Sequence, residues 1–201
     1  GERKMEEKKF EEYTDDIMGQ TKALLDIDSP AGYTTEAAKY TLKVLNDLGY
    51  NPTMTHKGGV LVCIGGEDKN DGVLIETHID TLGGMISSVK DNGRLLIVPL
   101  GGLKCNNIEG ENVRIITKFN GVYEGTYQLA NASLHVNPQY TEKPRNFDEM
   151  EIVIDEEVKD KDDVAALGIA AGDVVCFEPR MRITKNGYIK SRFLDDKLGS
   201  G

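Results

Sequence analysis

The stretch Val73-Leu74-Ile75-Glu76-Thr77-His78-Ile79-Asp80 decides the fold, because a short apolar run here ends on a cluster of polar residues. A second apolar run of the same kind lies at residues 59–64. Both runs are bounded by Gly, Asn and Asp, which is typical of buried strands in a sheet. In an α/β layer, ligands sit at the carboxyl ends of the strands, so we expect residues 77–80 to lie at a functional site.

Two amphipathic helices are predicted ahead of these strands. Apolar residues recur at helical spacing among charged residues over positions 6–25. A second apolar stripe covers positions 38–48, where Thr34 or Thr35 can cap the start of the helix and Gly49 can end it. Helices that alternate with buried strands imply an α/β fold.

Beyond Gly84 the pattern changes to short β-type runs separated by turn signals such as Asn92-Gly93 and Asn120-Gly121. One helix is predicted within this region, over residues 160–167. The charge run at 155–163 indicates a solvated surface. The region as a whole predicts a small β-barrel or sandwich with strands near 85–89, 95–98, 113–118, 122–129, 174–177 and 181–184.

Composition excludes some classes of function. The chain has 34 acidic and 24 basic residues and a net charge of −10, which argues against nucleic acid as a partner, since phosphate binding needs a basic face. We find neither an apolar run long enough to span a membrane nor the apolar core of a secretory signal, so we expect a cytoplasmic protein. The three cysteines form no C-x-x-C pair and are predicted to be buried thiols: Cys63, Cys105 and Cys176.

Two short motifs could hold a metal. In His78-Ile79-Asp80 a strand would place both polar side chains on one face, where His78 could bind a divalent ion and Asp80 could orient a ligand or the catalytic water. The alternative is a structural histidine. The adjacent carboxylates of Asp195 and Asp196 repel each other unless a cation, an arginine or hydrogen bonds compensate them. The alternative interpretation of this pair is a helix N-cap at the first Asp, followed by a second acidic residue that interacts favourably with the helix dipole.

Other chemistry has weaker support. His56 is expected in a loop and His135 in the barrel, rather than at a metal. No Ser lies in G-x-S-x-G, and no Cys lies in a recognisable pattern with His, so nucleophilic catalysis is not indicated. The glycine pairs match neither dinucleotide nor phosphate-loop patterns and are more typical of tight turns.

Read together and in order, several stretches resemble the M42 family of co-catalytic metallo-aminopeptidases, which includes tetrahedral (TET) and glutamyl aminopeptidases. The resemblance implies a catalytic α/β domain, incomplete here, into which a small β-barrel assembly domain is inserted. We therefore expect catalytic segments at 5–84 and 188–201 around a barrel at 85–187, with the natural polypeptide continuing further. The matching stretches are residues 28–32, 77–83, 99–102, 167–169 with 172–173, and 189–197.

The resemblance also implies roles for individual residues. His78 looks like a ligand of one metal, Asp195 like the carboxylate that bridges two metals, and Asp80 like the carboxylate that supports the catalytic site. Asp196 is expected to support Asp195 across a cis peptide bond. The implied cofactors are two divalent ions of Zn, Co or Mn. In that family the proton acceptor is the first Glu of a downstream pair, and a later Asp and His complete the site; none of these is assignable within residues 1–201.

The activity implied by the resemblance is hydrolysis of amino-terminal residues from short peptides. The family also implies homo-oligomers, from dimers to dodecamers. One alternative is a catalytically inactive fragment or assembly module. Another is glycoside hydrolysis, because acid pairs can cleave glycosides. With no Trp and 6% aromatic residues, the chain has little with which to stack sugars.

Overall fold

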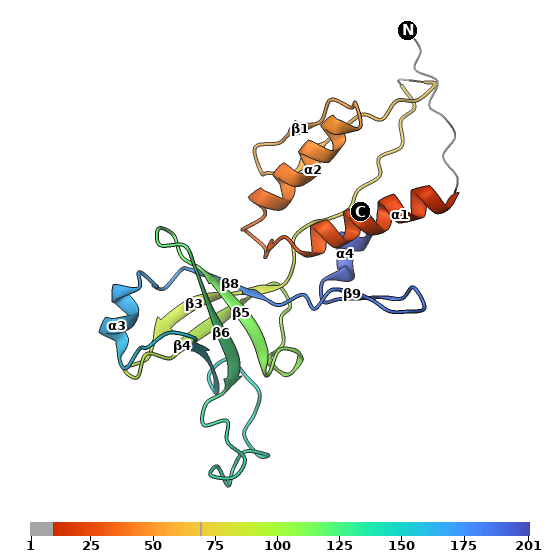
Figure 1. Ribbon diagram of the computed structural model, residues 1–201. Coiled ribbons are helices and arrows are strands. Elements are labelled where there is room, and N and C mark those ends of the chain that lie inside the picture. Colours follow the sequence, from red (N-terminus) through yellow and green to blue (C-terminus); the bar gives the residue numbers. More distant parts are fainter. Residues whose placement is uncertain (1–9, 69) are drawn as a thin grey trace. The chain divides into compact units, whose positions relative to one another are not determined.

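A computed structural model describes residues 10–68 and 70–201 of the 201-residue chain (Figure 1). The start of the first predicted helix, at residues 6–9, lies outside the described residues. The chain divides into two compact units. Unit 1 contains the chain up to Asp28, Thr34–Asp80 and Pro179–Gly201, and unit 2 contains Ser29–Tyr33 and Thr81–Glu178.

Helices dominate unit 1: α1 (Phe10–Leu25), α2 (Thr35–Asp47) and α4 (Leu194–Ser200). The first two confirm the predicted helices over the described residues. Gly49 ends α2 with a φ of 90° and donates its N–H to Asn46 O at 2.9 Å, the conformation for which glycine is suited. Within the described part of the chain, no helix has both the length and the apolar character needed to cross a membrane.

The prediction of two buried strands in unit 1 is wrong. Residues 59–64 contribute only the two-residue β2 (Val60–Leu61), which pairs with β1 (Thr53–Met54). The segment 72–80 contains no strand, and Val73 and Ile75 are 90% and 81% exposed. A strand needs a neighbour with which to form a hydrogen-bonded ladder, and no described segment pairs with this one. A second short hairpin joins β9 (Arg182–Ile183) to β10 (Ile189–Lys190).

Unit 2 is built on a closed antiparallel barrel with the strand order β3-β4-β7-β6-β5-β8 (Figure 1). This resolves the predicted barrel or sandwich in favour of the barrel. The sequence patterns predicted every strand except β7. The strands are β3 (Gly83–Val89), β4 (Leu95–Leu100), β5 (Glu111–Ile116), β6 (Val122–Leu129), β7 (Met150–Ile154) and β8 (Val174–Phe177).

Alternating side chains of these strands fill the barrel. Tyr127 and Phe177 are 0% and 1% exposed and pack edge to face, with ring centroids 5.8 Å apart. Cys105, in the 3-10 helix η1 (Cys105–Asn107), is buried beside Tyr127, and Cys176 of β8 is also buried. Cys63 of unit 1 is exposed, so the prediction of a buried thiol is wrong for that residue. Its predicted strand is not buried, which removes the basis of the prediction.

The helix α3 (Lys161–Ala166) lies between β7 and β8 and confirms the predicted helix. Asp160 caps its start, because its carboxylate accepts from the N–H groups of Asp162 and Asp163 at 2.9 and 3.0 Å. The phenol of Tyr123 on β6 donates to Leu167 O at 2.8 Å, which ties the end of α3 to the barrel.

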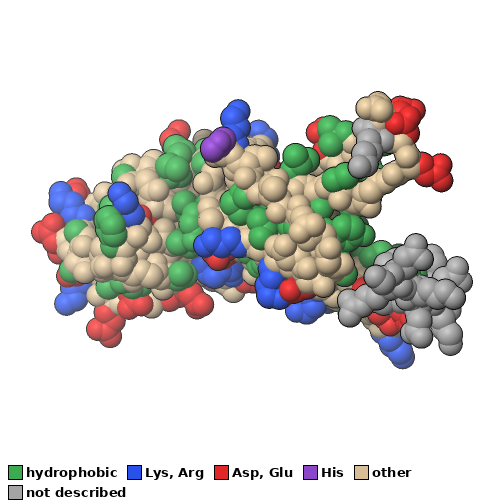
Figure 2. All heavy atoms as spheres, turned by 90° about the horizontal axis from the view of Figure 1, so that it is seen from above, with side chains coloured by type: hydrophobic (Ala, Val, Ile, Leu, Met, Phe, Trp, Pro, Cys, Tyr) green, Lys and Arg blue, Asp and Glu red, His purple; other side chains and the backbone are tan. Residues whose placement is uncertain are grey.

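Charged side chains of both signs are interspersed over the face drawn in Figure 2. Several form ion pairs on unit 2, including Lys90 with Glu151 at 2.8 Å and Arg145 with Glu109 at 2.9 Å. Only 8% of the Glu151 side chain is exposed, so Lys90 compensates a carboxylate that has lost most of its contact with water.

Close packing at Gly125 gives a testable consequence. A Cβ atom at this position of β6 would lie 2.6 Å from Val153 O on β7. Gly125→Ala is therefore expected to lower the free energy of unfolding by about 1–3 kcal/mol, since the two backbones must separate. Urea denaturation measures this change. Gly102→Ala is the control, because nothing lies within 4 Å of a Cβ there, and equal losses in the two variants would contradict the account.

Candidate metal centre

The structure brings the two sequence motifs of unit 1 together. His78 and Asp195 lie 117 positions apart in the chain, yet Nε2 of His78 is 3.1 Å from Oδ1 of Asp195. His78 belongs to the extended segment 72–80, and Asp195 lies in the first turn of α4. The peptide bond between Asp195 and Asp196 is cis, as the sequence resemblance implied.

The other nitrogen of His78 faces Asp80. Nδ1 of His78 lies 3.1 Å from the main-chain O of Asp80 and 3.3 Å from its Oδ1. A carbonyl oxygen can only accept a hydrogen bond, so Nδ1 carries the proton in the neutral imidazole. The lone pair of Nε2 then points at a carboxylate oxygen. Two acceptors at this distance need a cation between them, either a proton or a metal ion.

The electrostatics of His78 agree with this geometry. Burial lowers the pKa of His78, but the hydrogen bond to the Asp80 carbonyl and the Asp195 carboxylate raise it by more. The pKa of His78 therefore lies above its ordinary value. The His78 and Asp195 side chains are 50% and 94% exposed, so their attraction is screened by water and contributes little to folding. The stability of the fold therefore does not explain why His78 and Asp195 lie side by side.

A cluster of hydroxyl groups holds Asp196. Thr77 Oγ1 lies 2.5 Å from Asp196 Oδ2 and 2.9 Å from Ser200 Oγ. Ser200 Oγ also donates to the main-chain O of Asp196 or of His78, each at 3.2 Å. The Thr77 hydrogen bond lowers the pKa of Asp196 below its ordinary value, so this carboxylate stays ionised.

Thr77 and Ser200 are site residues that the sequence reasoning missed. Thr77 lies inside the motif that was singled out, but alternation along an extended segment points it away from the His78 side chain. A hydroxyl directly before the His was the available signal. Nothing in the sequence pattern of Ser200 indicated that it would meet Thr77.

The donor types suit a divalent transition metal. An imidazole nitrogen and a carboxylate oxygen each bind Zn²⁺ at about 2.0–2.2 Å, which puts two ligands of a tetrahedral ion roughly 3.3 Å apart. The observed 3.1 Å between Nε2 of His78 and Oδ1 of Asp195 is close to that spacing. Over residues 10–68 and 70–201, no group of three or more His, Cys, Asp or Glu side chains is placed to hold a metal. His78 and Asp195 are therefore a pair of donor groups within the described residues.

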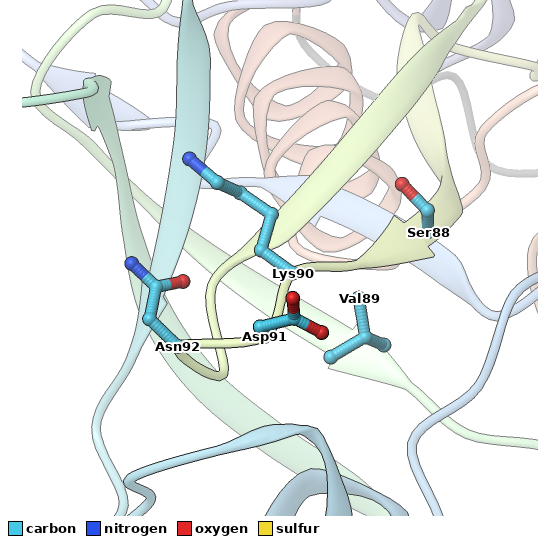
Figure 3. Close-up of a pocket in the computed structure, with 5 residues that line it drawn as sticks. All are labelled: Ser88, Val89, Lys90, Asp91 and Asn92. Atoms are coloured by element: carbon cyan, nitrogen blue, oxygen red, sulfur yellow. The ribbon is translucent and has the colours of Figure 1, made fainter.

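Neither of the other histidines belongs to such a group in the described chain. His56 is exposed in a turn of unit 1, as predicted. His135 is exposed in the loop between β6 and β7 of unit 2. A shallow depression also lies at the β3–β4 turn of unit 2, lined by residues 88–92 (Figure 3). Its charged side chains are paired with the protein itself, Lys90 with Glu151 and Asp91 with Lys161.

Comparison with known proteins identifies the family. The family model described as M42 glutamyl aminopeptidase matches residues 58–201. Protein YhfE of Bacillus subtilis (strain 168) is 40% identical over 176 residues, which cover 88% of this chain and 51% of YhfE. Glutamyl aminopeptidase of Lactococcus lactis subsp. cremoris (strain MG1363) is 27% identical over 190 residues, covering 92% of this chain and 52% of that protein.

A solved structure supports the same fold. The TET1 peptidase of Pyrococcus horikoshii superposes with a TM-score of 0.76 at 21% identity, covering 92% of this chain and 53% of that one. That peptidase can assemble into a tetrahedron or a large octahedral shell. The chain spans about half the length of the curated relatives it matches. The match of the family model over most of the chain shows that it belongs to the M42 glutamyl aminopeptidase family.

Proposed function

We propose that the chain supplies His78 and Asp195 to the two-metal centre of an aminopeptidase that removes amino-terminal residues from short peptides. The observation that carries this proposal is the contact of 3.1 Å between Nε2 of His78 and Oδ1 of Asp195. Nδ1 carries the proton that it donates to Asp80 O, so Nε2 of His78 and Oδ1 of Asp195 are both acceptors. A cation is therefore required between these two atoms. Family membership and the name of the Lactococcus relative support peptide bonds as the target.

Each residue has a distinct role in this proposal. His78 would hold a metal through Nε2, and the carboxylate of Asp195 would supply oxygen ligands to the same centre. Asp80 holds the His78 ring by accepting from Nδ1–H, which fixes the orientation of Nε2. Asp196, held by Thr77 and Ser200, keeps the Asp195 segment in place.

Divalent ions bound there would supply a water of lowered pKa and polarise the scissile carbonyl. Zn²⁺, Co²⁺ and Mn²⁺ all accept imidazole and carboxylate ligands, so occupancy follows availability as well as affinity. We propose that the remaining ligands and the residue that accepts the proton of the water come from the part of the protein outside this chain.

Metal removal and restoration test the proposed activity directly. The complete gene product is treated with a chelator and assayed on aminoacyl-p-nitroanilides before and after Zn²⁺, Co²⁺ or Mn²⁺ is added. We expect turnover to be lost with the metal and restored by at least one of the three ions. Turnover that survives complete demetallation would refute the proposal. Soluble cellulose, assayed in parallel, is expected to remain uncleaved.

The affinity for metal is expected to depend on pH. A metal must displace the proton from Nε2 of His78, and the pKa of His78 in the metal-free protein lies above its ordinary value. The affinity for Co²⁺ should therefore fall by about tenfold for each pH unit below that pKa and level off above it. Titrations between about pH 5.5 and pH 8.5 cover the range. Affinity that rises toward acidic pH would contradict the prediction.

We further propose that the full protein forms homo-oligomers through the barrel of unit 2. The support is the assembly of the Pyrococcus horikoshii TET1 peptidase into closed shells. Light scattering on the purified gene product is expected to give a mass of at least a dimer. A mass equal to one chain at micromolar concentration would exclude this part of the proposal.

A further inference from the structure

Lys197 carries a buried positive charge directly after the two aspartates. The residue is only 1% exposed. Removing an ammonium group from water is costly unless acceptors compensate the charge. Nζ of Lys197 donates to Leu24 O at 2.7 Å and to Ile27 O at 2.5 Å. These two main-chain carbonyls are among the groups that take the place of water around this charge.

The acceptors of Lys197 lie at the end of α1. The last carbonyls of a helix have no partners inside the helix and carry the negative end of its dipole, so a cation is stabilised there. Leu24 belongs to the last turn of α1, and Ile27 follows two residues after the helix ends. The same helix end has an exposed cation, Lys22, which pairs with Asp26 at 2.7 Å.

A second contact joins α4 to α1. A Cβ atom at Gly201, directly after α4, would lie 2.1 Å from Oγ1 of Thr21, which is fully buried. The segment with Asp195 and Asp196 is therefore held on one side by Thr77 and on the other by α1. Of these anchors, only Lys197 combines burial with a full charge.

We propose that Lys197 is a positioning residue of the metal centre, whose ammonium group, seated on the carbonyls that end α1, holds Asp195 at His78. This inference rests on the proposed metal centre but concerns a different residue and a different interaction. Without the buried cation, α4 keeps only its contact at Gly201 with α1, and the carboxylate of Asp195 is no longer fixed 3.1 Å from Nε2 of His78.

The test compares three variants of the complete gene product: Lys197→Met, Lys197→Arg and Lys22→Met. Met keeps most of the length of the side chain without its charge, and Arg keeps the charge and the donors. Lys22→Met is the matched control, because it removes an exposed cation from the same end of α1. Two quantities are measured, the affinity for Co²⁺ from visible absorption and amide hydrogen exchange at Asp195 and Asp196 without metal.

We expect Lys197→Met to weaken Co²⁺ binding by about 10- to 100-fold and to speed exchange at Asp195 and Asp196. Lys197→Arg should retain most of the affinity, and Lys22→Met should match the wild type. Wild-type affinity and exchange in Lys197→Met would overturn the inference while leaving the metal centre standing. If circular dichroism shows that Lys197→Met is unfolded, Lys197→Gln replaces it and is judged by the same outcomes.

A wild-type protein that binds no Co²⁺ would count against the proposed function instead. Hydrogen exchange then still decides the role of Lys197 in the metal-free protein. The inference is supported if exchange in Lys197→Met is faster only at Asp195 and Asp196 and is unchanged in Lys22→Met. Lys197 then positions this segment. Unchanged exchange, or faster exchange throughout α1 and α4 alike, rejects it in favour of a purely structural lysine.

Discussion

His78→Ala is expected to reduce kcat/KM for peptide hydrolysis by at least about a thousandfold, equivalent to about 4 kcal/mol of transition-state stabilisation. The substitution removes the only imidazole that contacts Asp195 among the described residues, and with it one ligand of the proposed centre. Metal content, measured by atomic emission after dialysis, should fall together with the activity. A far-ultraviolet circular dichroism spectrum equal to that of the wild type would show that the rate loss follows from lost metal rather than from misfolding.

The control for this variant is His135→Ala, since His135 is also exposed but lies on unit 2. It should leave activity and metal content unchanged. Asp195→Asn should resemble His78→Ala, because an amide is a much weaker metal ligand than a carboxylate. A His78→Ala protein that keeps its metal and more than about a tenth of its activity would contradict the assignment.

Tyr127→Ala is expected to lower the free energy of unfolding by about 3–5 kcal/mol, the range found when a large buried aromatic side chain is removed. Tyr127 is fully buried in the barrel, packs edge to face on Phe177 and has Oη 3.3 Å from Sγ of Cys105. Burial raises the pKa of Tyr127, so the phenol stays neutral and gains from its thiol partner only a weak hydrogen bond. Urea denaturation followed by near-ultraviolet circular dichroism measures the loss.

Tyr127→Phe separates packing from hydrogen bonding. It removes only the hydroxyl group and should cost about 1 kcal/mol. If both variants lose the same free energy, the ring packing does not stabilise the barrel as described. Neither variant touches unit 1, so metal binding at His78 is expected to persist in Tyr127→Phe.

The barrel was predictable because its signals are local. A turn such as Asn120-Gly121 separates two alternating runs that pair with each other as neighbours, β5 with β6. The strand β7 was missed because a charge run follows it directly and its partners, β4 and β6, precede it at varied distances in the chain. Helices α1 and α2 followed from apolar spacing, which depends on no distant partner.

The prediction of buried strands in unit 1 failed because a strand also depends on a partner distant in the sequence. Residues 72–80 have the apolar composition of a buried strand, but composition cannot supply the neighbouring backbone that a ladder requires. Ile75 is accordingly 81% exposed, and the site at 77–80 is held by side-chain contacts instead of by a sheet.

The candidate site was predictable in part. The sequence singled out His78, Asp80 and Asp195, and the family that their motifs resembled is confirmed by the family model. Their roles at a metal remain predictions. The contributions of Ser200 and Lys197 could not be read from sequence, because each depends on a contact across more than 100 positions of the chain.

The most direct test of the account is a crystal structure of the complete gene product grown with Zn²⁺, with anomalous scattering measured at the zinc edge. We predict two anomalous peaks about 3.5–4 Å apart. One should lie within about 2.2 Å of Nε2 of His78, and both should contact the carboxylate of Asp195. A zinc-bound protein whose anomalous peaks touch neither His78 nor Asp195 would contradict the account.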